Sequence, residues 1–132
     1  MLILDTHALL WLRYGDHRLG QRARQEAEHA WRADAAAVSA FTFWEVAMLR
    51  AKGRRDFPED VSRWRQSMLE EGLIEIPVDG DIGVRSITLP DFPADPADRI
   101  IIATALAGHQ LVTADERILG WTGSLNRLDA RV

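Results

Sequence analysis

The sequence contains no cysteine, which excludes disulfide bonds, thiol nucleophiles and zinc sites built on cysteine. Its histidines, at positions 7, 17, 29 and 109, form no HExxH motif and no pair at helical spacing, which argues against a zinc hydrolase. A metal site in this chain would therefore have to use carboxylates, alone or with a histidine.

Long apolar runs are also missing, because no stretch approaches the roughly 20 apolar residues of a membrane-spanning helix. The start of the chain, MLILD, has neither the basic residues nor the cleavage site of a secretory signal. We therefore expect no membrane partner and a cytoplasmic location. The chain has 132 residues, 47% of them hydrophobic, which predicts a single domain over residues 1–132 with a substantial core.

Lysine is scarce, because Lys52 is the only lysine among 16 basic residues and all the others are arginine. Against them stand 20 acidic residues, so the formal net charge is -4. An acidic balance discourages a polyanionic partner, whereas arginine favours paired hydrogen bonds to phosphates and carboxylates. Charge alone therefore leaves the partner open.

Short apolar runs and helical patterns alternate along the chain. The runs predict strands at residues 2–4, 35–38, 73–76 and 110–113, and a last edge strand at 128–132. The helical patterns predict helices at residues 8–12, 18–33, 41–52, 59–71, 79–86, 95–106 and 116–119. Three prolines mark a loop at residues 90–96. This alternation predicts an α/β fold with helices layered on a mainly parallel sheet.

Acidic residues follow several of these predicted strands. Asp5 and Asp115 come directly after strands, and Glu45 lies on the helix that follows Ser39. Asp98 lies in the first turn of the most apolar helix. Since ligand sites of parallel sheets lie beyond the carboxyl ends of the strands, we expect these four acids to converge at one edge of the sheet.

Each acid also has a purely structural interpretation. Asp5 and Asp115 suit the N-cap of a helix, and Asp95 before Pro96 suits it even better. Asp98 would complement the helix dipole in any case. Glu45 shares a helix face with Phe41, Met48 and Leu49, where a charge needs either a cation or an arginine partner. These alternatives remain open at the level of sequence.

A cluster of carboxylates is most readily explained by a hard cation. Like charges in one place raise each other's pKa and oppose folding unless a cation lies between them. Oxygen ligands without cysteine or histidine favour Mg²⁺ or Mn²⁺, which activate water and stabilise charge on a phosphoryl group. The chemistry predicted is hydrolysis of a phosphodiester, and no serine–histidine–aspartate arrangement competes with it.

Four segments together resemble one known family: residues 4–11 (LDTHALLW), 39–47 (SAFTFWEVA), 95–105 (DPADRIIIATA) and 111–118 (LVTADERI). They resemble PIN-domain ribonucleases, and in particular the VapC toxins of bacterial VapBC toxin–antitoxin pairs. The resemblance implies a PIN-like three-layer fold, with a central mainly parallel sheet between helices. One departure is the absence of a histidine at residues 92–94, where similar toxins often carry one.

The resemblance also assigns roles to individual residues and names partners. It implies that Asp5, Glu45, Asp98 and Asp115 form a catalytic site for Mg²⁺ or Mn²⁺, with Asp5 and Asp98 as the central ligands. The supporting residues that it implies are the hydroxyls of Thr6, Ser39 and Thr113, with Asp95 as a helix cap and Arg99 beside the site or against a partner. The expected partners are an RNA substrate, often tRNA, a VapB-type antitoxin and a second copy of the chain.

Two other functions fit the same pattern. The chain would be a catalytically silent PIN scaffold that binds another protein, or a different Mg²⁺-dependent phosphoryl hydrolase. A hydrolase of the haloacid dehalogenase type would carry a second aspartate two residues after Asp5, where this chain has His7. The intact set of four acids favours the ribonuclease over both.

Basic and aromatic residues leave further questions open. Arg50, Lys52, Arg54 and Arg55 form a cluster, followed by Arg63 and Arg65, that suits RNA, the antitoxin or plain solvent. Trp11 and Trp44 are expected to pack in the structure. Trp31 and Trp64, which have charged neighbours, are expected at a dimer or antitoxin surface.

Overall fold

The structure, a computed structural model, describes residues 1–91 and 95–132. The expected loop at residues 90–96 and its missing histidine lie partly outside the described residues. Within the described parts of the chain, no helix is both long and apolar enough to cross a membrane.

Five strands form one sheet in the order β3-β2-β1-β4-β5, and every neighbouring pair is parallel. The strands are β1 (Leu2–Leu4), β2 (Ala36–Ser39), β3 (Ile74–Ile76), β4 (Gln110–Thr113) and β5 (Arg127–Asp129). The expected parallel sheet is therefore confirmed. Strand β1 lies at its centre, between β2 and β4, although it stands first in the sequence.

Seven helices are found among the described residues, close to the positions that the sequence predicts. They are α1 (Thr6–Arg13), α2 (Gln21–Arg32), α3 (Ala40–Ala51), α4 (Val61–Glu70), α5 (Gly80–Ile87), α6 (Pro96–Ala105) and α7 (Glu116–Leu119). Six of them begin at a side-chain cap, since an aspartate or Ser39 accepts a hydrogen bond from a backbone N–H of the first turn. Helix α2 begins at Gly20 without such a bond.

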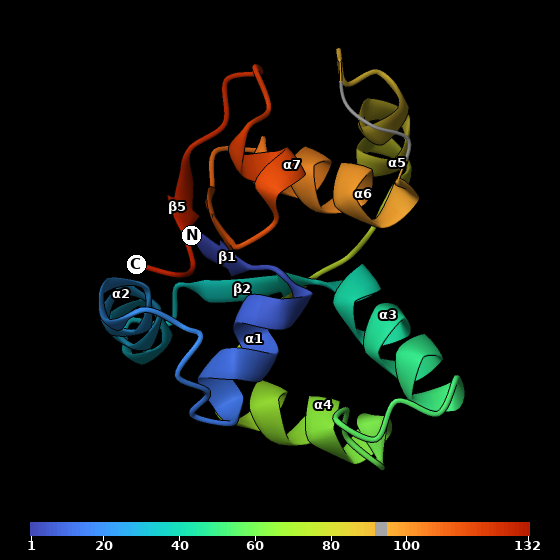
Figure 1. The fold of residues 1–132 in the computed structure, drawn as a ribbon. Helices are drawn as coiled ribbons and strands as arrows, with labels where there is room; N and C mark the ends of the chain where they lie inside the picture. Colours follow the sequence, from blue (N-terminus) through green and yellow to red (C-terminus); the bar gives the residue numbers. More distant parts are fainter. Residues whose placement is uncertain (92–94) are drawn as a thin grey trace.

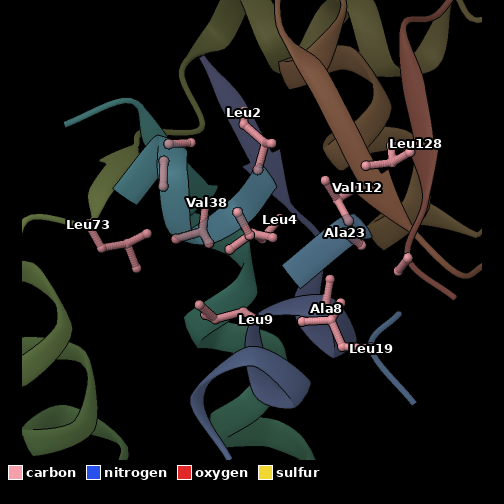
Figure 2. Close-up of a cluster of buried hydrophobic side chains, with 14 of the residues drawn as sticks. Leu2, Leu4, Ala8, Leu9, Leu19, Ala23, Val38, Leu73, Val112 and Leu128 are labelled. Atoms are coloured by element: carbon pink, nitrogen blue, oxygen red, sulfur yellow. The ribbon is translucent and has the colours of Figure 1, made fainter. Parts of the chain in front are cut away.

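The sheet separates two apolar layers, as Figure 1 shows for the helices on either side of β1 and β2. Because side chains alternate along a strand, Leu2 and Leu4 pack against the layer of α1, α2 and α4 (Figure 2), whereas Ile3 packs against α6 and α7. Within the second layer, Ile102 of α6 is completely buried. The three-layer α/β architecture predicted from the sequence is confirmed.

The last strand differs from the prediction, because it covers residues 127–129 rather than 128–132. After Asp129 the backbone turns, and the carbonyl groups of Ala130 and Val132 accept hydrogen bonds from the N–H groups of Gly20 and Arg22 at 2.8 Å each. These carbonyls satisfy donors at the start of α2, which the missing side-chain cap leaves free. A Cβ atom at Gly20 would lie 2.1 Å from the backbone of Val132, so this close approach requires glycine.

Candidate metal and active site

One cavity of about 350 Å³ opens at the carboxyl ends of the central strands. It is lined by Asp5, Thr6, His7, Trp11, Glu45, Asp95, Asp98, Ile101, Ala114, Asp115 and Arg117. All four acids predicted to converge therefore meet here. They come from four elements, because β1 leads into Asp5, α3 carries Glu45, α6 carries Asp98 and β4 leads towards Asp115.

Asp5 is the most deeply buried of the four acids and makes two kinds of contact. Its Oδ1 accepts a hydrogen bond from the N–H of Ala8 at 2.8 Å and so caps α1. Its Oδ2 accepts a hydrogen bond from the hydroxyl of Thr113 at 2.5 Å. Burial raises the pKa of Asp5, and the hydrogen bonds from Thr113 and Ala8 oppose this shift. The carboxylate is thus held in one orientation at the end of the central strand.

Glu45 is oriented by a neighbouring hydroxyl group. The Oγ1 of Thr6 donates a hydrogen bond to Oε1 of Glu45 at 2.5 Å and lies 3.2 Å from the Oγ1 of Thr42. Thr6 and Thr42 are both buried. This chain of hydroxyls from α1 to α3 holds Glu45 in place and agrees with the orienting role expected of Thr6.

Asp98 lies in the first turn of α6 with 15% of its side chain exposed. Burial, followed by repulsion from Asp115 and Asp95, raises the pKa of Asp98 to about 7, although the charge of Arg117 opposes the shift. Raised carboxylate pKa values are typical of functional sites and also occur in structural ion-pair networks. Burial contributes most to the shift of Asp98, and the repulsion expected between the clustered carboxylates adds to it.

Asp115 caps the short helix α7 and faces Arg117. Its Oδ1 accepts hydrogen bonds from the N–H groups of Arg117 and Ile118, and its Oδ2 lies 3.2 Å from Nη2 of Arg117. Burial would raise the pKa of Asp115, but the hydrogen bonds from the side chain and backbone of Arg117 hold it below its usual range. The pKa of Asp98 is therefore raised and that of Asp115 is lowered, although both residues line one cavity.

The remaining predicted residues lie in different places. Thr113 contacts Asp5 directly, and Asp95 both caps α6 and lines the cavity. Ser39 is buried and caps α3 by accepting a hydrogen bond from the N–H of Phe41 at 3.1 Å. Arg99 donates a hydrogen bond to the carbonyl of Ser86 on α5 at 3.2 Å. Neither Ser39 nor Arg99 lines the cavity.

Among the residues that line the cavity, Arg117, Trp11 and His7 were not predicted as site residues from the sequence. Arg117 stands two residues after Asp115, and its position within the motif LVTADERI was the only available signal. Trp11 was expected merely to pack, but it lines both the acidic cavity and an adjoining one of about 190 Å³. His7 also lines both cavities and connects them.

The structure also places the other tryptophans for which the sequence raised an expectation. Trp44 is 56% exposed, so the prediction that it packs internally was wrong, because on α3 it points away from the face that carries Val46. Trp31 and Trp64 are partly buried against the core, and their place at a dimer or antitoxin surface stays a prediction. The Nε1 of Trp31 donates a hydrogen bond to the carbonyl of Glu71, and the ring of Trp64 meets the ring of Phe43 edge-on.

Several arginines of the basic cluster at the end of α3, and Arg65 after it, make hydrogen bonds and ion pairs within the fold. Arg50 donates a hydrogen bond to the carbonyl of Phe57, and Arg54 forms an ion pair with Asp56 at 2.8 Å. Arg65 pairs with Glu75 of β3 through two hydrogen bonds of 2.7 Å. Of these arginines, Arg54 lies beside the adjoining cavity that His7 and Trp11 share with the acidic site.

The donor set suits Mg²⁺ or Mn²⁺ chemically, because it consists of carboxylate oxygens. Its present geometry is not that of a closed metal site, since within the described residues no three carboxylate or imidazole groups are placed to hold a metal ion. The guanidinium group of Arg117 lies among the acids instead, 2.6 Å from Asp98. The acidic residues therefore suit the cation by their chemistry. In this structure Arg117 contacts two of them, Asp98 and Asp115.

Fold and site together define a class: three-layer α/β proteins with an acidic centre at the carboxyl ends of a parallel sheet. Comparison with known proteins then identifies the family, because residues 2–120 match the PIN domain. The chain belongs to the PIN-domain family. It is 35% identical over 119 residues to Ribonuclease VapC22 of Mycobacterium tuberculosis, which covers 89% of this chain and 88% of that protein.

Solved structures show the same fold. A chain in a toxin–antitoxin complex from Klebsiella pneumoniae matches with a TM-score of 0.66 and 26% identity, covering 98% of both chains. A chain of DNA-bound VapBC from Salmonella typhimurium matches with a TM-score of 0.67 and 15% identity, covering 97% of this chain and 96% of that one. The resemblance to VapC-type PIN domains inferred from the four sequence segments is thus confirmed.

Proposed function

We propose that this protein is a VapC-type toxin, an endoribonuclease that depends on Mg²⁺ or Mn²⁺ and hydrolyses phosphodiester bonds in RNA. The observation that carries the proposal is the convergence of Asp5, Glu45, Asp98 and Asp115 on one cavity. The similarity to Ribonuclease VapC22 supports the same activity. A cytoplasmic place of action follows from the substrate, cellular RNA.

The four acids would hold the cation, with Asp5 and Asp98 nearest to the reacting phosphate. A bound Mg²⁺ or Mn²⁺ would supply an activated water and would stabilise the charge that develops on the phosphate. The protein's own contribution is to place the carboxylates. Thr113 orients Asp5, and Thr6 orients Glu45, so that their oxygens face the cavity in fixed positions.

Substrate contacts are proposed for the adjoining cavity of about 190 Å³. It shares His7 and Trp11 with the acidic cavity and is also lined by Tyr14, Arg18 and Arg54. Arg18 and Arg54 form ion pairs with Asp16 and Asp56 of the same cavity, so a phosphate would exchange with these carboxylates. Aromatic rings stack on bases of single-stranded nucleic acid, and arginine pairs with phosphates. These side chains suit the nucleotides next to the cleaved bond.

We further propose a VapB-type antitoxin and a second copy of this chain as protein partners. The relevant support is that the matched chain from Klebsiella pneumoniae comes from a toxin–antitoxin complex. Purification of the protein alone and after co-expression with its neighbouring reading frame would test both assemblies by light scattering. A monomer in both preparations would contradict this part of the proposal.

The activity is tested by incubating purified protein with a mixture of structured RNAs and Mg²⁺ or Mn²⁺. We expect cleavage by the wild type and none by Asp5→Asn or Asp98→Asn. Asparagine at position 5 still accepts the hydrogen bond from Ala8, so the capped helix should remain folded. The matched control is Asp81→Asn, an exposed acid on α5 paired with Arg85, which should cleave like the wild type.

Equal cleavage by the wild type and Asp5→Asn would reveal a contaminating nuclease and overturn the assignment. Absence of cleavage by the folded wild type, with either ion and every RNA, would favour the catalytically silent scaffold. A circular dichroism melt of each variant separates loss of activity from loss of structure.

A further inference from the structure

Arg117 places a single nitrogen atom against three carboxylates of the acidic cavity. Its Nη2 lies 2.6 Å from Oδ2 of Asp98, 3.2 Å from Oδ2 of Asp115 and 3.7 Å from Oδ2 of Asp95. Two of these acids lie at the start of α6 and the third caps α7. The carboxylates thus converge on one point, and a positive charge occupies that point.

The position of this charge conflicts with direct metal binding. Mg²⁺ binds carboxylate oxygens at about 2.0–2.1 Å, and a short hydrogen bond from a guanidinium uses the same lone pairs. Oδ2 of Asp98 already accepts such a bond from Arg117. A cation coordinated by that oxygen and the guanidinium group would also repel each other across a few ångströms. While the guanidinium group of Arg117 remains on Asp98, it therefore opposes binding of the cation.

Open space lies beside the side chain of Arg117. It is 49% exposed, and it also lines a separate cavity of about 410 Å³ beside α7. Asp91 and Glu116 line that second cavity too, so a displaced guanidinium finds carboxylates there. The backbone of Arg117 stays fixed, because its N–H is bonded to Asp115. A rotation of the side chain alone is sufficient.

We propose that Arg117 is a built-in counter-ion that holds Asp98 and Asp115 together in the metal-free protein and that must leave Asp98 before a divalent cation binds. This inference rests on the proposed function, because it assumes that the four acids are the cation's ligands. Arg117 then lowers the metal affinity of the site and limits the fraction of loaded enzyme at cellular Mg²⁺ concentrations. Arg117 is a positioning residue in this account.

The test is a titration of the full chain with Mn²⁺. Binding is measured by calorimetry and by the electron paramagnetic resonance signal of free Mn²⁺. We expect Arg117→Gln to bind Mn²⁺ about tenfold more tightly than the wild type, because no strong charge-assisted bond has to be broken first. Without metal, the variant should melt at a lower temperature than the wild type, and saturating Mn²⁺ should narrow or reverse this difference.

Two further variants complete the experiment. Arg65→Gln is the matched control, because Arg65 likewise makes short ion-pair contacts with an acid, Glu75, that does not line the acidic cavity. Its Mn²⁺ affinity should equal that of the wild type. Arg117→Lys keeps the charge and provides a folded alternative if Arg117→Gln is unstable, with an affinity between those of the wild type and the glutamine variant.

The possible failures are distinguishable. Unchanged or weaker Mn²⁺ binding by both Arg117 variants, with clear binding by the wild type, would overturn the role of Arg117 and leave the proposed function intact. Absence of Mn²⁺ binding by the wild type and by every Arg117 variant would overturn the metal site itself, and this inference with it. Asp98→Asn, which should lose Mn²⁺ binding, shows that the titration reports on this site.

Discussion

The hydroxyl of Thr113 lies 2.5 Å from Oδ2 of Asp5, although 108 residues separate the two in sequence. The same oxygen of Thr113 accepts a hydrogen bond from the N–H of Asp115 at 3.0 Å. One buried hydroxyl therefore connects the acid at the end of β1 with the acid that follows β4. The two strands are neighbours in the sheet, so their ends are held in register by this side chain.

Substitution Thr113→Val should impair the site without removing any carboxylate. Valine keeps the shape but cannot donate to Asp5, and loss of a residue that orients a metal ligand costs about 10–100-fold in metal affinity or activity. RNA cleavage rates and Mn²⁺ titration measure the effect. The matched control is Thr104→Val, since Thr104 is equally buried but donates only to the carbonyl of Ile100. Equal activity of both variants would show that Asp5 needs no orienting hydroxyl.

Replacement of the cap at Asp95 separates its two roles. Asp95→Ala removes the acceptor for the N–H of Ala97 and should lower the free energy of unfolding by about 1 kcal/mol. Asp95→Asn keeps that acceptor, so it should unfold in urea almost like the wild type. If Asp95 acts mainly as a cap, as its position before Pro96 predicts, Asp95→Asn also retains RNA cleavage. A large loss of cleavage in this variant would place Asp95 among the essential acids.

The apolar layer beneath the site should depend strongly on Ile102. Its side chain is fully buried between α6 and the sheet, so Ile102→Ala should lower the free energy of unfolding by about 2–5 kcal/mol. Ile87 on α5 provides the control, because it is 76% exposed and Ile87→Ala should change stability by less than about 0.5 kcal/mol. Urea denaturation monitored by tryptophan fluorescence measures both. A small loss for Ile102→Ala would mean that α6 repacks readily.

The ion pair between Arg65 and Glu75 predicts a pH dependence of stability. Its hydrogen bonds hold the pKa of Glu75 below the ordinary value of 4.5. A lowered pKa contributes stability above pH 4.5, and that contribution is lost as the pH falls below this value. Because both side chains are partly exposed, the effect should stay below about 1 kcal/mol.

Glu75→Gln should therefore be slightly less stable than the wild type at pH 7, and this difference should be smaller at about pH 3, because protonation below pH 4.5 weakens the ion pair. The urea midpoint at the two pH values provides the measurement. Glu70→Gln is a suitable control, since Glu70 is exposed on α4 and accepts a hydrogen bond at 3.2 Å from the uncharged amide of Gln66. A constant difference between Glu75→Gln and the wild type at both pH values would rule out this ionisation as the cause.

The sequence predicted the sheet and the four acids well because both depend on local signals. Asp5 illustrates this, since its two interpretations, as a helix cap and as one of the converging acids, proved compatible: Oδ1 caps α1, and the residue also lines the acidic cavity. Asp115 behaves alike, with Oδ1 capping α7 and Oδ2 near Arg117. The position after a parallel strand serves a cap and a ligand site equally well, because both use the start of the next helix.

The features that were missed depend on distances between elements. Arg117 reaches Asp98, 19 residues earlier, only because α6 and α7 lie on the same face of the sheet. Trp44 shares the helix of Glu45, and its exposure depends on which neighbouring element covers that side of α3. Neither the contact of Arg117 with Asp98 nor the exposure of Trp44 can be predicted from a local pattern of residues. The residues that could be predicted are those whose own strand or helix places them.

The central position of β1 also determines when the acidic centre can exist. β1 leaves the ribosome well before its partner β4, which is made only at residues 110–113. Pairings so distant in sequence form slowly and late. A nascent or truncated chain that ends before β4 lacks Thr113 and Asp115, so it cannot hold Asp5 in place. Synthesis therefore has to pass β4 before the chain can present an assembled centre to the RNA around it.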